Sequence, residues 1–325
     1  MKGWALRIGL GFMLLAAPLA AEAQPAGKPV RIGWVSVTSP SPDRGPEQQR
    51  PIVELHLRQS GWNPHFELRY ADGDLTRLAA MAEELARAQL AVIVAPDMQG
   101  ARAAQKATAT IPIVMSSGDP IGAGLVASLA KPGGNITGVS VAFDDSFAGK
   151  WVELLRDIGP VSSIAVVWNP ASAGAAGRID VIERAAATHG VRVLRLEIRN
   201  AADVEVVNQA LARTKVGGLI FDADLTLIPY RDRIIEATRR HRVPSVFAYA
   251  QQAAAGGLLA YGPSLTEVYR LIGVYVDRIL RGSKPSELPV EQVRKYDLVI
   301  NLTTAKALGL TIPPSLLQRA DQVIE

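Results

Sequence analysis

The 325-residue sequence contains no cysteine, and this absence excludes several kinds of chemistry at once. A disulfide, a thiol nucleophile or a thiolate metal site needs a cysteine side chain, so none of these can be present. A chain without cysteine would also raise no pairing problem if it were exported to an oxidising compartment.

Charged residues are sparse, and they form no block of one sign. They make up 20% of the sequence, and the formal net charge is +4. Proteins that bind nucleic acid usually carry a clustered basic patch, so we expect no nucleic-acid partner here. The hydrophobic share of 48% and the length are typical of a globular protein with two sizeable cores.

The motifs of common enzyme classes are also missing. The sequence has no G-x-S-x-G elbow, no P-loop and no H-E-x-x-H pair. The glycine run at 131–139 precedes a predicted strand rather than a helix, so it indicates a turn and not a phosphate site. Asp119 and the pair Asp144 and Asp145 could act as hydrolytic carboxylates, but nothing in the sequence brings them together. We expect no catalytic residue, no metal and no cofactor, with an α/β hydrolytic enzyme as an alternative.

No apolar run is long enough to span a membrane. The run from Ile8 to Ala20 follows Lys2 and Arg7 and precedes the small-x-small site at residues 21–23. This order is typical of a secretory signal peptide, which we predict over residues 1–23 with cleavage after Ala23. A membrane anchor is the alternative, but the run is shorter than the roughly 20 residues that a spanning helix needs. We therefore expect a periplasmic protein with no membrane span after cleavage.

Strand-like and helix-like segments alternate along the rest of the chain. Residues 30–37 form an apolar run, residues 65–74 alternate between polar and apolar, and a third apolar strand is expected at 91–97. Between them, Leu78, Ala82 and Leu85 recur at helical spacing. Because strands and helices take turns, we expect an α/β fold with parallel sheets.

The same order of segments occurs twice. "IPIVMSS" at 111–117 is matched by "VPSVFAY" at 243–249, and each places a proline where a strand begins. A missing N–H costs little at the start of a strand. The repeat predicts two similar Rossmann-like lobes.

Further segments follow the second copy, and they predict a hinge. A strand at 256–262, a helix at 265–280 and a strand near 296–302 exceed what two closed lobes need. We expect about three crossing strands, near Gly138, Gly256 and Pro289. The expected first lobe is 30–138 plus 257–286, and the second is 139–256 plus 287–325. A hinge between two such lobes forms a cleft.

Polar and aromatic residues follow the predicted strands, at the edge that faces the ligand crevice in parallel sheets. Serine hydroxyls and helix-entry N–H groups suit a carboxylate, Asp224 suits an ammonium, and Tyr249 or Phe143 suits an apolar side chain. Each also has a structural alternative: serine and aspartate as helix N-caps, Phe143 as a core residue and Met98 as a filler. The predicted ligand-binding residues are Ser36, Ser39, Met98, Ser117, Asp119, Phe143, Asn169, Asp224, Tyr249 and Gln251.

Four stretches resemble a known family. They lie at 111–140, 256–262, 275–292 and 296–325, and the last reads "YDLVINLTTAKALGLTIPPSLLQRADQVIE". The chain from about residue 30 to 325 is similar to ABC-transporter substrate-binding proteins, in the family that includes tryptophan- and tyrosine-binding members. The resemblance implies a type I periplasmic-binding fold, no enzymatic activity, and delivery of a captured solute to an inner-membrane permease.

The resemblance also bears on the ligand. Asp224 is similar to a ligand-amine contact, although Leu225 stands where relatives often have asparagine, and Ser117 resembles a position that meets a carboxylate. The segments at 96–100 and 248–252 depart from the commoner patterns of small residues. An amino acid, possibly aromatic, and a related aromatic acid therefore both stay open.

The partner also has alternatives. A binding protein that serves a chemoreceptor or a histidine kinase would bind a small molecule in the same way. By analogy with the family, we expect a monomer.

Overall fold

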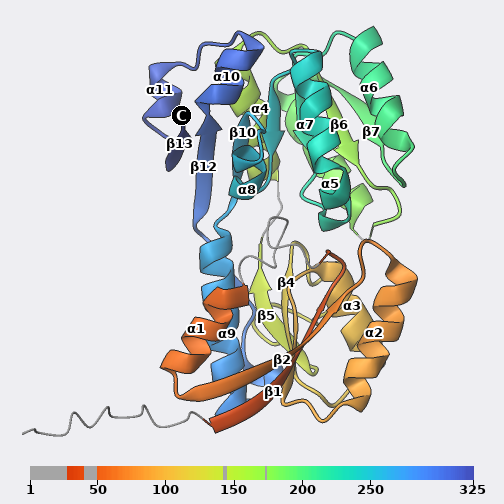
Figure 1. Cartoon of the computed structure of the whole chain (residues 1–325), viewed down its shortest axis with the longest axis vertical. Coiled ribbons are helices and arrows are strands. Elements are labelled where there is room, and N and C mark those ends of the chain that lie inside the picture. The colour runs from red at the N-terminus through yellow and green to blue at the C-terminus, as the bar shows by residue number, and fades with distance from the viewer. Residues whose placement is uncertain (1–27, 40–49, 142–144, 173) are drawn as a thin grey trace, which may run out of the picture.

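The computed structural model describes residues 28–39, 50–141, 145–172 and 174–325. The chain forms two α/β lobes that are stacked along the long axis of the molecule (Figure 1). The predicted signal peptide, residues 1–23, lies outside the described residues. No helix in the described part of the chain has the length and apolar character needed to cross a bilayer.

The first lobe is built on a six-stranded sheet with the order β11-β5-β4-β3-β1-β2, in which every pairing is parallel. Helices α1 and α9 cover one face and α2 and α3 cover the other. The bounds are β1 (Lys28–Ser36), α1 (Arg50–Gln59), β2 (Trp62–Tyr70), α2 (Leu75–Arg87), β3 (Val92–Ala95), α3 (Met98–Ala107), β4 (Ile113–Ser117), β5 (Ile136–Ser140), α9 (Leu265–Leu280), η3 (Pro285–Glu287) and β11 (Glu291–Gln292).

The second lobe is built on a seven-stranded sheet with the order β13-β12-β10-β9-β8-β6-β7. Its pairings are parallel except for β10 with β12, which is antiparallel. Helices α4, α5, α10 and α11 pack on one face, and α6, α7 and α8 pack on the other. The bounds are α4 (Asp145–Ile158), β6 (Ser163–Trp168), α5 (Ala175–Thr188), β7 (Arg192–Glu197), α6 (Asp203–Arg213), β8 (Gly218–Phe221), η2 (Leu225–Tyr230), α7 (Arg231–Arg240), β9 (Ser245–Phe247), α8 (Ala250–Ala254), β10 (Leu259–Pro263), β12 (Tyr296–Asn301), α10 (Leu302–Leu308), α11 (Pro314–Leu317) and β13 (Gln322–Ile324).

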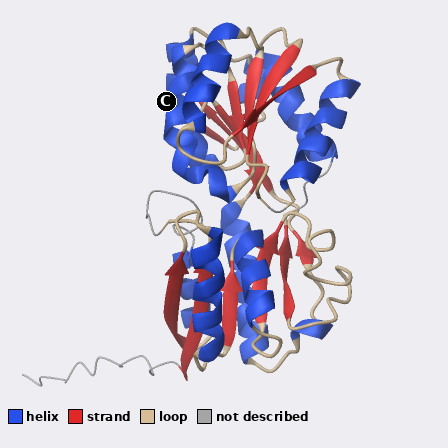
Figure 2. Cartoon of the chain, turned by 90° about the vertical axis from the view of Figure 1, so that its right-hand side faces the viewer, coloured by secondary structure: helices blue, strands red, loops and turns tan. Residues whose placement is uncertain are grey.

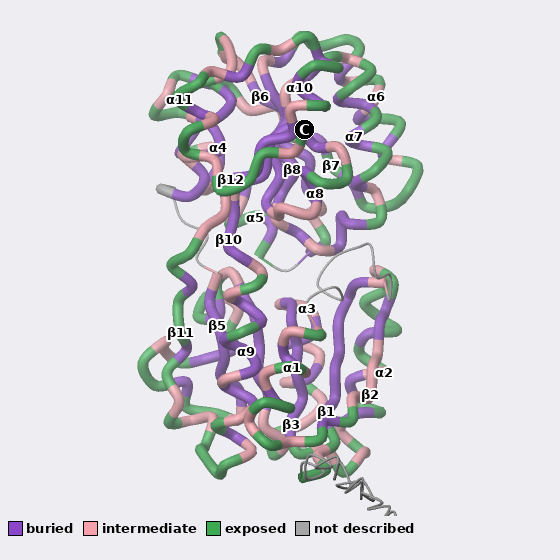
Figure 3. The backbone as a smooth tube through the Cα atoms, turned by 60° about the vertical axis from the view of Figure 1, so that its left-hand side comes forward, coloured by how far each residue is buried: buried purple, intermediate pink, exposed green. Residues whose placement is uncertain are grey.

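The strands form the buried centre of each lobe. Strands β3 and β8 are buried along their whole length, which agrees with their unbroken apolar sequences. Figure 3 shows buried strands inside each lobe with exposed turns around them, and Figure 2 shows helices on the outside of the sheets. Both sheets therefore have cores of their own.

The two prolines of the sequence repeat have the same structural role. The Pro112 carbonyl accepts a hydrogen bond from Ile93 N at 2.9 Å, and the Pro244 carbonyl accepts one from Leu219 N at 2.8 Å. Each proline thus stands directly before a strand, lends its carbonyl to the neighbouring strand and has no N–H to satisfy. The match supports the prediction of two similar lobes.

Strand membership differs from the expected boundaries in three places. Strand β5 stays in the first sheet to Ser140, β10 belongs to the second sheet, and β11 pairs with β5 in the first. The crossings therefore lie after Ser140, between β10 and α9, and between β11 and β12.

Gly138 and Gly256, which were expected at crossing points, have other structural roles. Gly256, with φ of 111°, turns the chain from α8 into β10 within the second lobe. Gly138, with φ of 140°, lies inside β5, where a Cβ atom would stand 2.2 Å from Met115 O. Close approach between β5 and β4 requires glycine there.

Candidate functional site

A cavity of about 410 Å³ lies between the two lobes, at the carboxyl ends of their strands. Its volume falls in the range of small-molecule sites, roughly 300–1,000 Å³. Both lobes supply its walls. We call it the main cavity, and its lining residues include Asp97, Met98, Gln99, Ser116, Ser117, Gly118 and Asp119 from the first lobe and Phe147, Ser172, Gly174, Arg178, Asp224, Leu225 and Tyr249 from the second.

Asp97 forms part of the first-lobe wall because it follows β3 and caps α3. Its Oδ1 accepts a hydrogen bond from Gly100 N at 2.7 Å, and its Oδ2 accepts bonds from Ser36 Oγ at 2.7 Å and Val37 N at 3.1 Å. Burial raises the pKa of Asp97. The hydrogen bonds from these donors lower it in part, the nearby Asp224 carboxylate raises it further, and the net shift is upward. The Asp97 carboxylate is therefore fixed in place.

Two further residues of the first-lobe wall lie at or after the end of β4. The Ser117 side chain is buried, and its Oγ has no hydrogen-bond partner among the described residues. An unpaired buried hydroxyl on a cavity wall is available to a ligand. Asp119 is exposed and accepts a hydrogen bond from Gly122 N at 2.8 Å, so it caps the turn that follows.

A buried ion-pair network forms the second-lobe wall. Arg178, near the start of α5, donates to Asp222 from Nε at 3.0 Å and from Nη2 at 2.8 Å, and its Nη2 also lies 2.8 Å from Asp224 Oδ2. Burial by itself lowers the pKa of Arg178, but the two carboxylates raise it, and the net shift is upward. Arg178 therefore stays charged and holds both acids in position.

Asp224 also caps the short helix η2. Its Oδ1 accepts hydrogen bonds from Thr226 N at 2.8 Å and Thr226 Oγ1 at 2.7 Å. Asn169 supports this cap from behind, because its Nδ2 donates to Thr226 Oγ1 at 2.9 Å. One oxygen of Asp224 thus caps η2, and the other pairs with Arg178.

Tyr249 completes this wall beside the acids. Its hydroxyl donates to the Ala223 carbonyl at a long 3.4 Å. Burial raises the pKa of Tyr249, and among the nearby charges Arg178 lowers it while Asp222, Asp224 and Asp97 raise it. The phenol is therefore neutral and presents a ring and a hydroxyl to the cavity.

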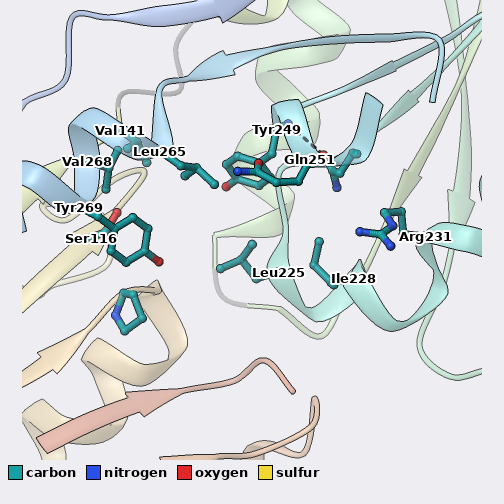
Figure 4. A pocket seen from close by; sticks show the side chains of 12 residues that line it. Ser116, Val141, Leu225, Ile228, Arg231, Tyr249, Gln251, Leu265, Val268 and Tyr269 are labelled. Carbon is teal, nitrogen blue, oxygen red and sulfur yellow. Dashed lines mark hydrogen bonds between the residues drawn. The ribbon is translucent and has the colours of Figure 1, made fainter. Parts of the chain in front are cut away.

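A smaller cavity of about 30 Å³ adjoins the main one (Figure 4). The two share Pro96, Ser116, Val141, Leu225 and Tyr249, and α9 closes the far side with Leu265, Val268 and Tyr269. Gln251 lines the smaller cavity, and its buried Oε1 has no partner in the described part of the chain. This space is water-sized and polar at one end.

Contacts across the cleft join the lobes. Gln99 Nε2 in α3 donates to Ser172 Oγ before α5 at 2.7 Å. A Cβ atom at Gly174 would stand 3.5 Å from Met98 Sδ. The loop ends of the two lobes therefore touch in this structure.

The structure brings most of the predicted site residues together. Five of them, Met98, Ser117, Asp119, Asp224 and Tyr249, line the main cavity, and Gln251 lines the smaller one. Ser36 and Asn169 lie behind the walls, as partners of Asp97 and Thr226. Ser39 lines neither cavity, since it stands beyond the end of β1. Phe143 lies outside the described residues.

Sequence reasoning missed several residues of the second-lobe wall, among them Phe147 and Arg178. Phe147 lines the cavity from α4, a helix that the strand-end argument did not consider. Arg178 stands in the first turn of α5, where the helix dipole disfavours a cation. A cation in this position needs nearby acids to stabilise it. The position of Arg178 in the predicted helix was therefore the one sequence signal that indicated acidic partners. Within the described segments, no group of three or more His, Asp or Glu is placed to hold a metal ion.

Comparisons with known proteins agree with this architecture. A family model described as ABC transporter substrate binding protein matches residues 56–324. A tyrosine-binding protein of Clostridioides difficile is 25% identical over 278 residues, which make up 84% of this chain and 79% of that protein.

Two solved structures are similar over most of this chain. A conserved domain protein from Vibrio cholerae is 30% identical with a TM-score of 0.84, covering 90% of this chain and 99% of that one. An ABC domain from Streptococcus pneumoniae in complex with L-Trp is 26% identical with a TM-score of 0.81. The match covers 90% of this chain and 100% of that one. The chain belongs to the ABC transporter substrate-binding protein family, whose members bind solutes and are not enzymes.

Proposed function

We propose that the chain is the extracytoplasmic solute-binding protein of an ABC importer and captures an amino acid, with an aromatic side chain favoured, between its lobes. One observation carries this proposal. The main cavity is lined from both lobes, and it contains the unpartnered Ser117 hydroxyl on one wall and the carboxylate of Asp224 on the other, among the described residues. The tyrosine-binding and L-Trp-bound relatives support the aromatic amino acid.

The cavity offers complementary groups for the parts of such a ligand. Ser117 and the start of α3, where Met98 and Gln99 line the cavity, suit the carboxylate, because the first N–H groups of a helix lack intrahelical partners. Asp224 suits the ammonium through a charge-assisted hydrogen bond. Phe147, Leu225 and Tyr249 supply apolar surface for the side chain.

Capture requires that the ligand bind both lobes more tightly in the closed form than in the open one. The Gln99 to Ser172 bond is a contact of a closed arrangement. We propose lobes that follow sheet membership, residues 28–141 plus 264–293 and residues 145–263 plus 294–325, with the hinge at the crossings between them.

Location and partner complete the proposal. Residues 1–23 are proposed to direct export and to be removed, so that a soluble monomer delivers its solute to an inner-membrane permease. N-terminal sequencing of the exported protein should begin at Gln24. A mature chain that begins at Met1 would contradict this part.

A thermal-shift screen over the natural amino acids and matched aromatic acids tests the binding proposal. A bound solute stabilises the folded state by mass action, so the cognate class should raise the melting temperature by several degrees. Small-angle scattering with the best ligand should then show a protein at least as compact as the free one. If no amino acid and no aromatic acid raises the melting temperature, the proposed function is wrong.

A further inference from the structure

We propose that Asp97 and Asp224, which reach the main cavity from opposite lobes, form a split acidic site that binds one ammonium group of the ligand and is complete only when the lobes are closed. This inference rests on the proposed function and deepens it, because it names the chemical group that the ligand must carry. Asp97 follows β3 in the first lobe, and Asp224 follows β8 in the second.

Both carboxylates are buried and held in fixed orientations. Asp97 is 5% exposed and Asp224 is 6% exposed, and both line the main cavity. Each accepts three hydrogen bonds from protein donors: Asp97 from Ser36, Val37 and Gly100, and Asp224 from Arg178 and twice from Thr226. A carboxylate offers about four acceptor sites, so each keeps capacity for one more donor.

The ion pairs around the cavity leave one buried acid without a cation. Among the described residues, Arg178 pairs with both Asp222 and Asp224, Asp97 forms no ion pair, and Arg102 is the other cation that lines the main cavity. Asp222 accepts three hydrogen bonds from Arg178, and Asp224 accepts one from the same guanidinium. A buried carboxylate without a cation is unfavourable, so Asp97 favours a cationic group in the cavity.

A second, independent feature points to the same ligand group. Ser117 is 3% exposed, lines the main cavity, and its Oγ has no partner within the described part of the chain. An ammonium group has three N–H donors. The Ser117 hydroxyl can donate its proton to the ligand carboxylate and still accept from the adjacent ammonium. Asp97, Asp224 and Ser117 together therefore offer three acceptors, and Asp224 comes from the lobe opposite the other two.

The placement of the two acids on opposite lobes couples ligand chemistry to closure. Bringing two carboxylates together in a buried cavity is unfavourable, so closure of the empty protein is opposed. An ammonium between them removes this repulsion and supplies the differential binding that closure needs. The other charged or titratable residues that line the cavity are Arg102, Asp119, Arg178 and Tyr249, among those that the structure describes.

The ligand class follows from this arrangement. A primary ammonium is required, and an aromatic acid without an amino group should be rejected. The site distinguishes L-tryptophan from 3-(indol-3-yl)propionate, and L-phenylalanine from 3-phenylpropionate, although each pair shares its ring and its carboxylate.

Calorimetric titration of the mature protein with these two pairs and with tryptamine tests the inference. The parent protein should bind an amino acid at least about 100-fold more tightly than its des-amino analogue, since a lost charge-assisted contact leaves buried acids unpaired. Asp97→Asn and Asp224→Asn should each weaken amino-acid binding by about 10-fold or more, and Asp97→Asn should reduce the preference over the des-amino analogue.

A matched control separates ligand binding from helix capping. Asp74→Asn makes the same change at the N-cap of α2, away from the cavity, and should leave affinity unchanged. Asparagine is a good N-cap, so Asp97→Asn should fold, and Asp97→Ser is the second variant if it does not.

Each outcome is decisive. Equal affinity for an amino acid and its des-amino analogue, or unchanged amino-acid affinity in folded Asp97→Asn, would overturn the split site while leaving solute binding intact. If no probe of either class binds the parent protein, it is the proposed function that fails.

Discussion

Gln99 in the first lobe donates a hydrogen bond to Ser172 in the second, with 2.7 Å between Nε2 and Oγ. Both residues line the main cavity, and the bond spans the cleft rather than the hinge. Such a contact exists only while the lobes are together, so it contributes to the closed state alone.

Loss of this bond should shorten the lifetime of the complex. A neutral hydrogen bond contributes about 0.5–1.5 kcal/mol, so we expect Gln99→Ala or Ser172→Ala to raise the dissociation rate roughly 2- to 10-fold. Stopped-flow displacement measures this rate. In a double-mutant cycle the second substitution should add little to the first, and fully additive effects would show that the pair does not act as one contact.

Removal of the Arg178 side-chain charge should destabilise the second lobe strongly. Arg178→Met leaves Asp222 and Asp224 buried without their cation, which costs about 3–5 kcal/mol of unfolding free energy. Urea denaturation checks this value. The control is Arg87→Met, whose exposed pair with Glu83 should contribute less than about 1 kcal/mol. Equal effects of the two substitutions would contradict the network.

A methyl group at Gly138 should strain the contact between β5 and β4. Its backbone has a φ of 140°, and the added Cβ would stand 2.2 Å from Met115 O. We expect Gly138→Ala to lower the free energy of unfolding by about 1–3 kcal/mol or more. Gly134→Ala is the matched control and should melt like the parent, because no atom of the described residues lies within 4 Å of the place its methyl group would take. A parent-like melting temperature for Gly138→Ala would refute this account of the glycine.

The stability difference between the parent protein and Asp97→Asn should depend on pH. Burial raises the pKa of Asp97 above its ordinary value of 3.8. Between the ordinary and the raised value the folded state binds more protons than the unfolded state, so the contribution of Asp97 to stability falls as pH rises. Asp97→Asn removes this dependence.

Melting temperatures of both proteins from about pH 4 to 8 measure the effect. As pH rises above the ordinary aspartate range, the melting temperature of Asp97→Asn should increase relative to that of the parent. At higher pH the difference between the two should stay constant. In the same window, ammonium binding to the parent should strengthen with pH, since the ligand favours the ionised carboxylate. A difference in melting temperature that is independent of pH would contradict the shifted pKa.

The sequence predicted the two-lobed fold because its signals are local. Apolar runs, helical spacing and the prolines before β4 and β9 each depend on neighbouring residues only, and the structure has strands and helices there. The positions of Ser117, Asp224 and Tyr249 on the cavity wall were predictable for a related reason. The carboxyl ends of parallel strands share one edge, so position along a strand predicts position in space.

The rest depends on pairing between distant segments, which a single sequence does not record. Strand β10 was expected in the first lobe, but it pairs with β9 and β12 in the second. Arg178 lies in a helix, and its partners Asp222 and Asp224 follow a strand more than forty residues later. Only the folded chain shows that these charges meet.

The crossings of the chain have a consequence for biosynthesis. Tyr269, Ile272 and Tyr275 in α9 belong to the same buried cluster as Trp34 and Leu57, so the amino-terminal lobe lacks part of its own interior until residues 265–280 have been made. A ribosome completes most of the other lobe first. The early segments of the nascent polypeptide therefore expose an apolar face until α9 has been synthesised. A product truncated before residue 265 should aggregate and should not yield a stable first lobe.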